Sequence, residues 1–237
     1  MFARHGISVH IYTDKLFDIN ENDKKRIHRF FIAALLAFLF LCLDVILALL
    51  ESKVYGVGVA DFSHSQLMVH WIIIIILWLL SALAVIFYGR RYCDYSAFKT
   101  QFKPTRSALL CGIGIPVLCI IALTVFNGKP GFVNYSSNAP DLTAFQYTYY
   151  ILEMLLAALL LSFAQKGFDS IGVNPMIPTG GMTLAVSWGL IHCFTKSSWS
   201  VALIAVALAM VFGVIHNLLG KDLRRTWPVM YLLFIWF

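Results

Sequence analysis

Apolar residues occur along the chain in long runs that short polar segments separate. The runs cover residues 28–50, 67–88, 106–126, 146–164, 180–195, 199–219 and 227–237. A helix needs about 20 mostly apolar residues to cross the hydrocarbon core of a bilayer. All but the fifth and the last run reach or approach that length. The pattern therefore indicates a protein with several membrane spans.

Each run is expected to be helical, because backbone groups in lipid must find their hydrogen-bond partners within the same segment. The β-branched stretch Ile72–Ile76 would favour a strand in water,. The length of the whole run overrides that preference in a membrane. We therefore predict an all-α fold, a polytopic membrane helix bundle of about seven transmembrane helices with the lipid bilayer as its surroundings.

The composition supports a membrane protein. Apolar residues make up 60% of the 237 residues and charged residues 13%, whereas a soluble domain carries about 25% charged residues. The mean hydropathy is +0.79. These values exclude an ordinary soluble enzyme, a disordered chain and a collagen-like chain.

The positions of the basic residues predict the topology. The net charge is +6, and most Lys and Arg residues lie before the first run or in the loops after the second, fourth and sixth runs. Lys53, Lys129 and Lys196 lie in the remaining loops. The positive-inside rule then places the N-terminus in the cytoplasm. Membrane topology and contact with anionic lipid explain the Lys and Arg residues, so no nucleic-acid partner is expected. We expect the protein in a cell membrane, namely the plasma membrane of a bacterium.

Four ionisable residues lie inside the apolar runs, and such residues are functional candidates because they are costly in lipid. They are Asp44, Glu153, His192 and His216. Counting the helical rise places the first three in the outer third of the membrane. His216 falls near the cytoplasmic end of its helix. The similar depths of Asp44, Glu153 and His192 allow these three residues to share a site, whereas His216 lies at a different depth.

Two interpretations of Glu153 and His192 stay open. In the chemical one, Glu153 is a general base and His192 a metal ligand, and a bound water is activated. In the structural one, Glu153 pairs with His192 or Lys196 and joins two helices. A catalytic zinc takes three protein ligands, and Asp44 is a candidate for the third. Further residues that support the site or are purely structural are Lys196, Trp188, Tyr149 and Asp44.

Three blocks between Tyr149 and Trp236 carry a family resemblance. One is the helix Ile151–Leu156 with Glu153. The second, Trp188–His192, looks like an FxxxH motif with Trp in place of Phe. The third, Ala207–Pro228, has a Gly-containing helix, a Gly-Lys turn and a Trp-Pro pair before the last helix. In this order they resemble the CPBP family, the Abi-like intramembrane metalloproteases related to CAAX prenyl endopeptidases.

The resemblance implies a domain organisation and an activity. Residues 1–27 would be a cytoplasmic N-terminal segment and 28–237 the membrane domain. Within the domain, 28–126 would form three N-terminal helices and 146–237 a CPBP-like core. The implied function is a metal-dependent endopeptidase with one divalent metal, zinc, in which Glu153 activates the metal-bound water and His192 is a ligand. The implied partner is a membrane-associated peptide or protein.

The chain also departs from the family pattern. The first motif, EExxxR, keeps only Glu153, because Ala157 or Ala158 stands where the Arg would be. The last helix has Met230–Leu233 where the family usually has a His. Two alternatives therefore remain beside the endopeptidase. One is a catalytically inactive CPBP-fold scaffold that binds another membrane or envelope protein, and the other is a small proton- or cation-coupled transporter.

Overall fold

The computed structural model describes residues 20–127, 140–195 and 198–236, and these ranges contain helices and no β-strand. The all-α prediction is thus confirmed for the described residues. In chain order the elements are α2 (Glu21–Leu41), α3 (Leu43–Tyr55), the short 3₁₀ turn η1 (Val59–Asp61), α4 (His64–Tyr92), α5 (Arg106–Asn127), α6 (Pro140–Ser170), α7 (Thr179–Leu184), the π-helical segment η3 (Ala185–Gly189), α8 (Leu190–Thr195), α9 (Trp199–Leu218) and α10 (Leu223–Trp236).

Five helical stretches in the described residues are long and apolar enough to cross a membrane. They correspond to the first four predicted spans and the sixth, and the first combines α2 and α3 into Glu21–Tyr55. Several helices begin before their apolar run, because polar residues cap them. Ser63 accepts a hydrogen bond from the Gln66 backbone N–H, and the Gln66 side chain accepts one from the Ser63 N–H in return,.

The other two predicted spans are helical but shorter. Residues 179–195 form α7, η3 and α8 in direct succession, and α10 covers 14 residues. Neither reaches the length expected of a simple span. A membrane protein with several spans is therefore supported, whereas the count of seven is not established by these helices.

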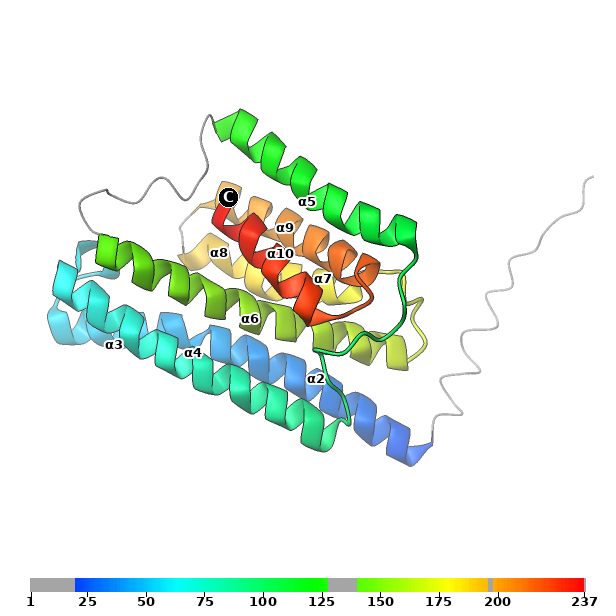
Figure 1. The fold of residues 1–237 in the computed structure, drawn as a ribbon. Helices are drawn as coiled ribbons and strands as arrows, with labels where there is room; N and C mark the ends of the chain where they lie inside the picture. The colour runs from blue at the N-terminus through cyan, green and yellow to red at the C-terminus, as the bar shows by residue number, and fades with distance from the viewer. Residues whose placement is uncertain (1–19, 128–139, 196–197, 237) are drawn as a thin grey trace, which may run out of the picture.

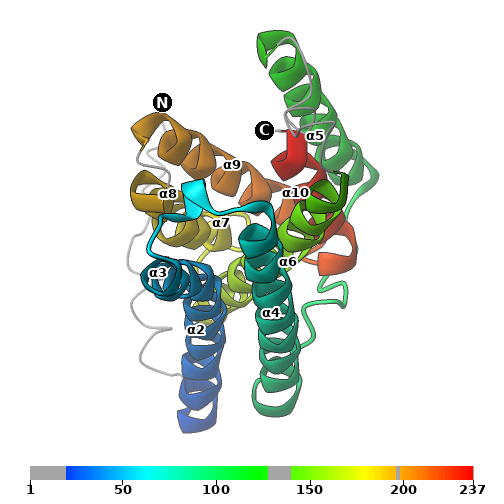
Figure 2. The same cartoon turned by 90° about the vertical axis from the view of Figure 1, so that its left-hand side faces the viewer.

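Helix α6 runs through the middle of the bundle (Figures 1 and 2). It contacts α2 and α4 on one side and α7 and α10 on the other. Within the apolar window of α6, 67% of the residues are buried, compared with 11% for α5, which lies at the edge against α9 and α10. Most side chains within the apolar window of α6 therefore face other parts of the protein.

Small residues let α7 and α9 approach closely. A Cβ added to Gly213 would lie 2.7 Å from the Gly181 Cα. The stripe that continues on α9, Ala205 and Ala209, is buried. Small residues spaced by four on α9 thus allow close packing, and the N-terminal part of α7 is the partner,.

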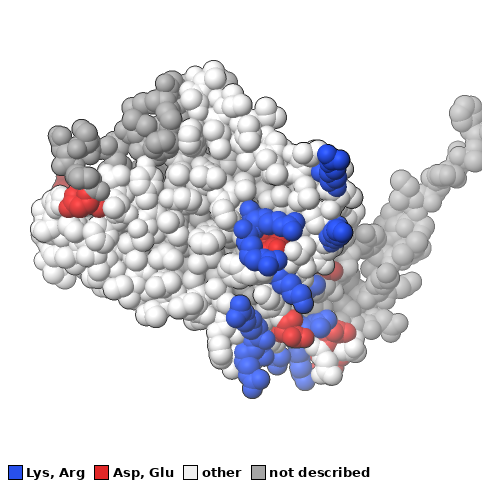
Figure 3. Space-filling model, viewed as in Figure 1, with Lys and Arg blue, Asp and Glu red and all other residues white. Residues whose placement is uncertain are grey.

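Lysine and arginine side chains gather at one end of the bundle (Figure 3). At this basic end α2, α5 and α10 begin and α4, α6 and α9 end. Among the described residues, Lys53 alone of the Lys and Arg side chains lies at the opposite end. The charge asymmetry expected from the sequence is therefore a property of the folded molecule.

Candidate functional site

The segment that carries Trp188 and His192 departs from regular α-helix. Residues Ala185–Gly189 form a π-helical turn, and the Leu190 N–H bonds back to the Ala185 carbonyl. Such turns are rare and occur frequently at functional sites. Gly189 sits against the backbone of α9, where an added Cβ would lie 3.0 Å from the Val206 Cα. The turn and this contact fix Trp188 in the core, where it is 3% exposed.

Trp188 joins the segment to the acid of α6. Its indole N–H donates to Glu153 Oε1 at 2.9 Å. Glu153 is 8% exposed and lies in the most buried of the five candidate spans. An indole N–H is a donor only, so the Glu153 oxygen is the acceptor of this bond. The predicted residues Glu153 and Trp188 are thus in direct contact.

His192 is held by the backbone of the same tryptophan. Its Nδ1 lies 2.7 Å from the Trp188 carbonyl oxygen, and the two rings meet edge to face with centroids 4.6 Å apart. A carbonyl oxygen can only accept, so Nδ1 is the donor and a neutral ring carries its lone pair on Nε2. Metal-binding histidines are commonly oriented by this kind of bond. Trp188 therefore contacts both predicted residues, Glu153 through its indole N–H and His192 through its backbone carbonyl.

The described donors do not complete a metal site. A catalytic zinc needs three protein ligands, whereas no group of three or more His, Cys, Asp or Glu side chains in the described ranges could hold a metal ion. On the α10 side, the Phe234 ring lies 5.8 Å from Trp188 and 5.1 Å from Tyr150. Thus α10 contributes an apolar ring beside Trp188, and zinc at Glu153 and His192 stays a prediction.

Asp44 and Tyr149 belong to a second polar cluster. The Tyr149 hydroxyl donates to Asp44 Oδ2 at 3.1 Å, and Asp44 Oδ1 lies 3.2 Å from His70 Nε2. The other nitrogen of His70, Nδ1, lies 2.6 Å from Glu51 Oε2. These contacts join α3, α4 and α6. Asp44 is therefore engaged with α4 and α6, as a partner of His70 and Tyr149.

The sequence analysis missed His70 and Glu51, although a signal was present. His70 lies within the apolar run 67–88, so the criterion that selected His192 applies to it as well. Glu51 follows the first apolar run directly, so the apolar pattern alone does not place it in a span. The structure buries both, with 4% exposure for His70 and 7% for Glu51. Helix α3 continues to Tyr55 and therefore includes Glu51, whose side chain lies inside the bundle.

The two clusters meet along α6. Tyr149 lies one helical turn before Glu153, so the two side chains share a face of the helix. The Tyr149 ring packs at 4.7 Å on Trp78, whose indole N–H donates to the Phe40 carbonyl. Polar groups from α3, α4, α6 and the 179–195 segment thus extend through the half of the bundle opposite the basic end.

Two of the expected residues are placed elsewhere or not described. Lys196 lies outside the described residues. His216 is buried near the basic end, where its Nδ1 lies 3.1 Å from the Thr226 hydroxyl on α10. The prediction that His216 stands apart from Glu153 agrees with this contact, because Thr226 is in the first turn of α10.

Ion pairs organise the basic end. Lys221 Nζ lies 2.6 Å from Asp169 Oδ2, and burial lowers the pKa of this lysine although Asp169 opposes the shift. Burial alone would raise the pKa of Asp222, but hydrogen bonds from Arg224 and Thr100 outweigh it and lower the pKa to about 2. These bonds join the 93–105 segment to the turn before α10.

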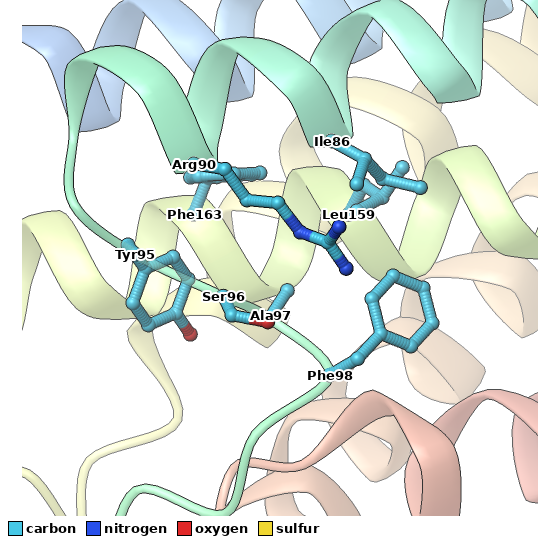
Figure 4. A pocket seen from close by; sticks show the side chains of 8 residues that line it. All are labelled: Ile86, Arg90, Tyr95, Ser96, Ala97, Phe98, Leu159 and Phe163. Atoms are coloured by element: carbon cyan, nitrogen blue, oxygen red, sulfur yellow. The ribbon is translucent and has the colours of Figure 1, made fainter.

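A shallow pocket also opens at the basic end, between α4, α6 and the 93–105 segment (Figure 4). The Arg90 side chain extends across it towards the Phe98 ring, with Tyr95 and Ser96 on the other side. The Tyr95 hydroxyl lies 2.9 Å from the Ser162 hydroxyl, and burial raises the pKa of Tyr95. Its lining includes neither Trp188 nor Glu153 nor His192, so the pocket does not belong to the candidate site.

Protein-family models, curated proteins and solved structures were compared with the chain, and none of the three comparisons finds a match. The resemblance to the CPBP family therefore depends on the motifs in the sequence alone.

Proposed function

We propose that this protein is an intramembrane endopeptidase of the CPBP type or a close relative of such enzymes. The observation that supports it is the contact of Trp188 with both Glu153 and His192. An acid and an imidazole that are far apart in the sequence meet at one buried residue, on a π-helical turn. Glu153 is buried and His192 is half-buried. Ionisable groups are costly within the membrane, and function is the expected reason for them.

Glu153 is the general base of the proposed reaction. It takes a proton from a water molecule, and the resulting hydroxide adds to the carbonyl carbon of a peptide bond. The tetrahedral species then breaks its C–N bond, and the proton passes to the leaving nitrogen, which gives an acid and an amine. The Nδ1 bond of His192 holds its ring in place, so that Nε2 can accept a hydrogen bond from the attacking water.

The substrate class follows from the location of the pair. Glu153 lies 13 residues after the first residue of α6, which corresponds to about 20 Å along the helix, and it falls within the apolar run 146–164,. A peptide bond must enter the bundle at this level to react. The substrate is therefore a membrane-associated peptide or protein, as the family resemblance also implies.

A second candidate function is a catalytically inactive scaffold that binds another membrane or envelope protein. The packing of Phe234 on Trp188 favours it, because α10 contributes an apolar ring beside Trp188, whereas the family resemblance implies a polar residue on the last helix. In this case the Glu153–Trp188 bond only joins α6 to the 179–195 segment.

Variants of Glu153 and His192 separate the two candidates. For an enzyme, Glu153→Gln should lower the rate of peptide cleavage by about 10²-fold or more while the protein stays folded. His192→Asn should reduce it as well, and Gln146→Ala on the same helix is the matched control. The cleavage rates are measured on a library of transmembrane peptides, with each protein in lipid nanodiscs. The metal content of each protein sample is determined in parallel. Equal cleavage by wild type and Glu153→Gln would contradict the endopeptidase function and favour the inactive scaffold.

We propose further that the seven spans expected from the sequence are all embedded in the plasma membrane of a bacterium, with the N-terminus in the cytoplasm. The gathering of Lys and Arg side chains at the basic end supports this orientation,.

A further inference from the structure

A groove opens on the outside of the bundle, between α2 and the 179–195 segment, with α6 as its floor. Phe31, Leu35 and Phe38 form the α2 wall, and Thr183 and Ser187 form the opposite wall. Helix α2 packs closely on α6 but only lightly on the 179–195 segment. The groove is therefore the space that the two walls leave open above α6.

The surface of the groove is apolar, although two of its lining residues carry hydroxyl groups. The Thr183 hydroxyl donates to the Thr179 carbonyl at 2.9 Å, and the Ser187 hydroxyl donates to the Thr183 carbonyl at 2.7 Å. The other described lining residues are Phe, Leu and Ala. Because the two hydroxyl donors are already bonded within their own helical segment, an apolar ligand can cover them without leaving a donor unpaired.

The dimensions of the groove suit an extended chain. Phe31 and Phe38 are seven residues apart, which corresponds to about 10 Å along the helix. The groove contains about 540 Å³ of empty space, and over this length the average cross-section is roughly 54 Å²,. A helix with its side chains is about 10 Å wide and needs roughly 80 Å². A hydrocarbon chain within one leaflet, about 15 Å deep, can follow the groove over its whole length.

One end of the groove is adjacent to positive charge. Phe31 marks the end nearer the basic end of the bundle, where its ring packs against Phe168 with centroids 5.2 Å apart. His28 and Lys24 lie three and seven residues before Phe31, so they continue the same face of α2, and both are exposed,. Within residues 21–29, four Lys and Arg residues outnumber two acids. An anionic group bound there would be stabilised.

We propose that the groove binds one acyl chain of an anionic phospholipid from the leaflet at the basic end, with the lipid phosphate at Lys24. An apolar slot of this width that leads to positive charge matches an amphiphile with an anionic head and an extended tail. The acyl chain fills the space between α2 and the 179–195 segment, so it packs against the segment that carries Trp188 and His192. The lipid site does not depend on the endopeptidase activity.

Native mass spectrometry of the full chain in detergent micelles, with added dipalmitoyl phosphatidylglycerol, tests the groove. One lipid molecule should bind to wild type more tightly than any further molecule. Leu35→Trp places a larger ring at the groove and should weaken the first binding step about tenfold. Leu83→Trp on α4 is the matched control, because Leu83 is 54% exposed and Leu35 55%, and Leu83 does not line the groove. Ser187→Leu, from the opposite wall, should give the same loss as Leu35→Trp, even where Leu35→Trp folds poorly.

The head-group contact is tested by charge variants. Lys24→Gln should weaken the binding of phosphatidylglycerol about fivefold and leave the binding of phosphatidylcholine with the same acyl chains unchanged. Arg26→Gln is the control, because Arg26 lies on the opposite face of α2 and should retain wild-type binding. Glycerol phosphate, which has the head-group charge without the acyl chains, should not displace the lipid.

Several results would overturn the proposal. Successive phosphatidylglycerol molecules that bind to wild type with equal affinity would indicate only unspecific lipid contact, as would equal losses from Leu35→Trp and Leu83→Trp. Displacement of the lipid by glycerol phosphate would indicate a phosphate site without an acyl chain. Displacement by a polyleucine transmembrane peptide would assign the groove to a helix. Loss of cleavage with unchanged lipid binding would instead concern only the endopeptidase.

Discussion

Trp188 shows how one residue can organise a site through two different groups. Its side chain donates to Glu153, and its backbone carbonyl accepts from His192. The sequence analysis selected Glu153 and His192 from the cost of burying ionisable groups in lipid, and it gave Trp188 as a supporting or purely structural residue. It did not identify Trp188 as the link, because a hydrogen bond between residues 35 positions apart in the sequence depends on packing.

Asp222 leads to a prediction about stability at low pH. Its carboxyl is fully buried and has a pKa of about 2, below the usual 3.8, so it binds protons more weakly in the folded protein. The resulting stabilisation is present above about pH 4 and is lost as the pH falls towards 2. Asp222→Asn should lower the free energy of unfolding by roughly 2 kcal/mol at neutral pH.

Denaturant unfolding of wild type and Asp222→Asn at neutral pH and near pH 2 measures this effect. The difference between the two proteins should shrink at the lower pH. Asp23→Asn is the control, because Asp23 forms an exposed pair with Arg26 that contributes about 0–1 kcal/mol,. A difference that is independent of pH would contradict the role assigned to the Asp222 carboxylate.

At the scale of elements, the 179–195 segment is where the sequence was least informative. Its apolar run is short, and the sequence suggested a simple span. The structure has α7, a π-helical turn and α8 instead, with α7 packed on α6 and α9. The two glycines at its start, Gly180 and Gly181, contact the backbones of α6 and α9. Contacts of this kind compensate for a helix that is too short to be stable alone.

Gly213→Ala tests the contact between α7 and α9. The new methyl would overlap the Gly181 backbone, so we expect a loss of about 1–3 kcal/mol in the free energy of unfolding,. Gly114→Ala is a matched control in α5, because an added Cβ meets no atom within 4 Å there. That control should leave stability unchanged or raise it by up to about 1 kcal/mol. Unfolding in mixed micelles provides the comparison, and equal effects of the two variants would contradict the close packing.

At the scale of the whole molecule, charge and apolarity are separated along the bundle. The basic end carries nearly all of the described Lys and Arg side chains, and the half away from it carries the two polar clusters. Long apolar side chains such as Leu110, Leu118 and Val125 on α5 are exposed. A surface with such an apolar belt is expected of a protein embedded in lipid.

Labelling of single cysteines tests the orientation. In a chain whose five cysteines are replaced, Lys53→Cys should react with an impermeant thiol reagent added to intact cells. Lys99→Cys, in the segment after α4, should react only after the membrane is opened, because the positive-inside rule places the basic end in the cytoplasm. The reverse pattern of labelling would place the N-terminus outside.

The sequence by itself determined the helical membrane class, the separation of charge and the candidate residues Glu153 and His192. These follow from local properties, namely the length of apolar runs and the cost of polar groups in lipid. Only the tertiary structure decided which polar groups meet. It placed Trp188 between Glu153 and His192, and it joined Asp44 to His70 and Glu51. The reason is physical, because the rotation and crossing of neighbouring helices depend on the packing of side chains from the whole bundle.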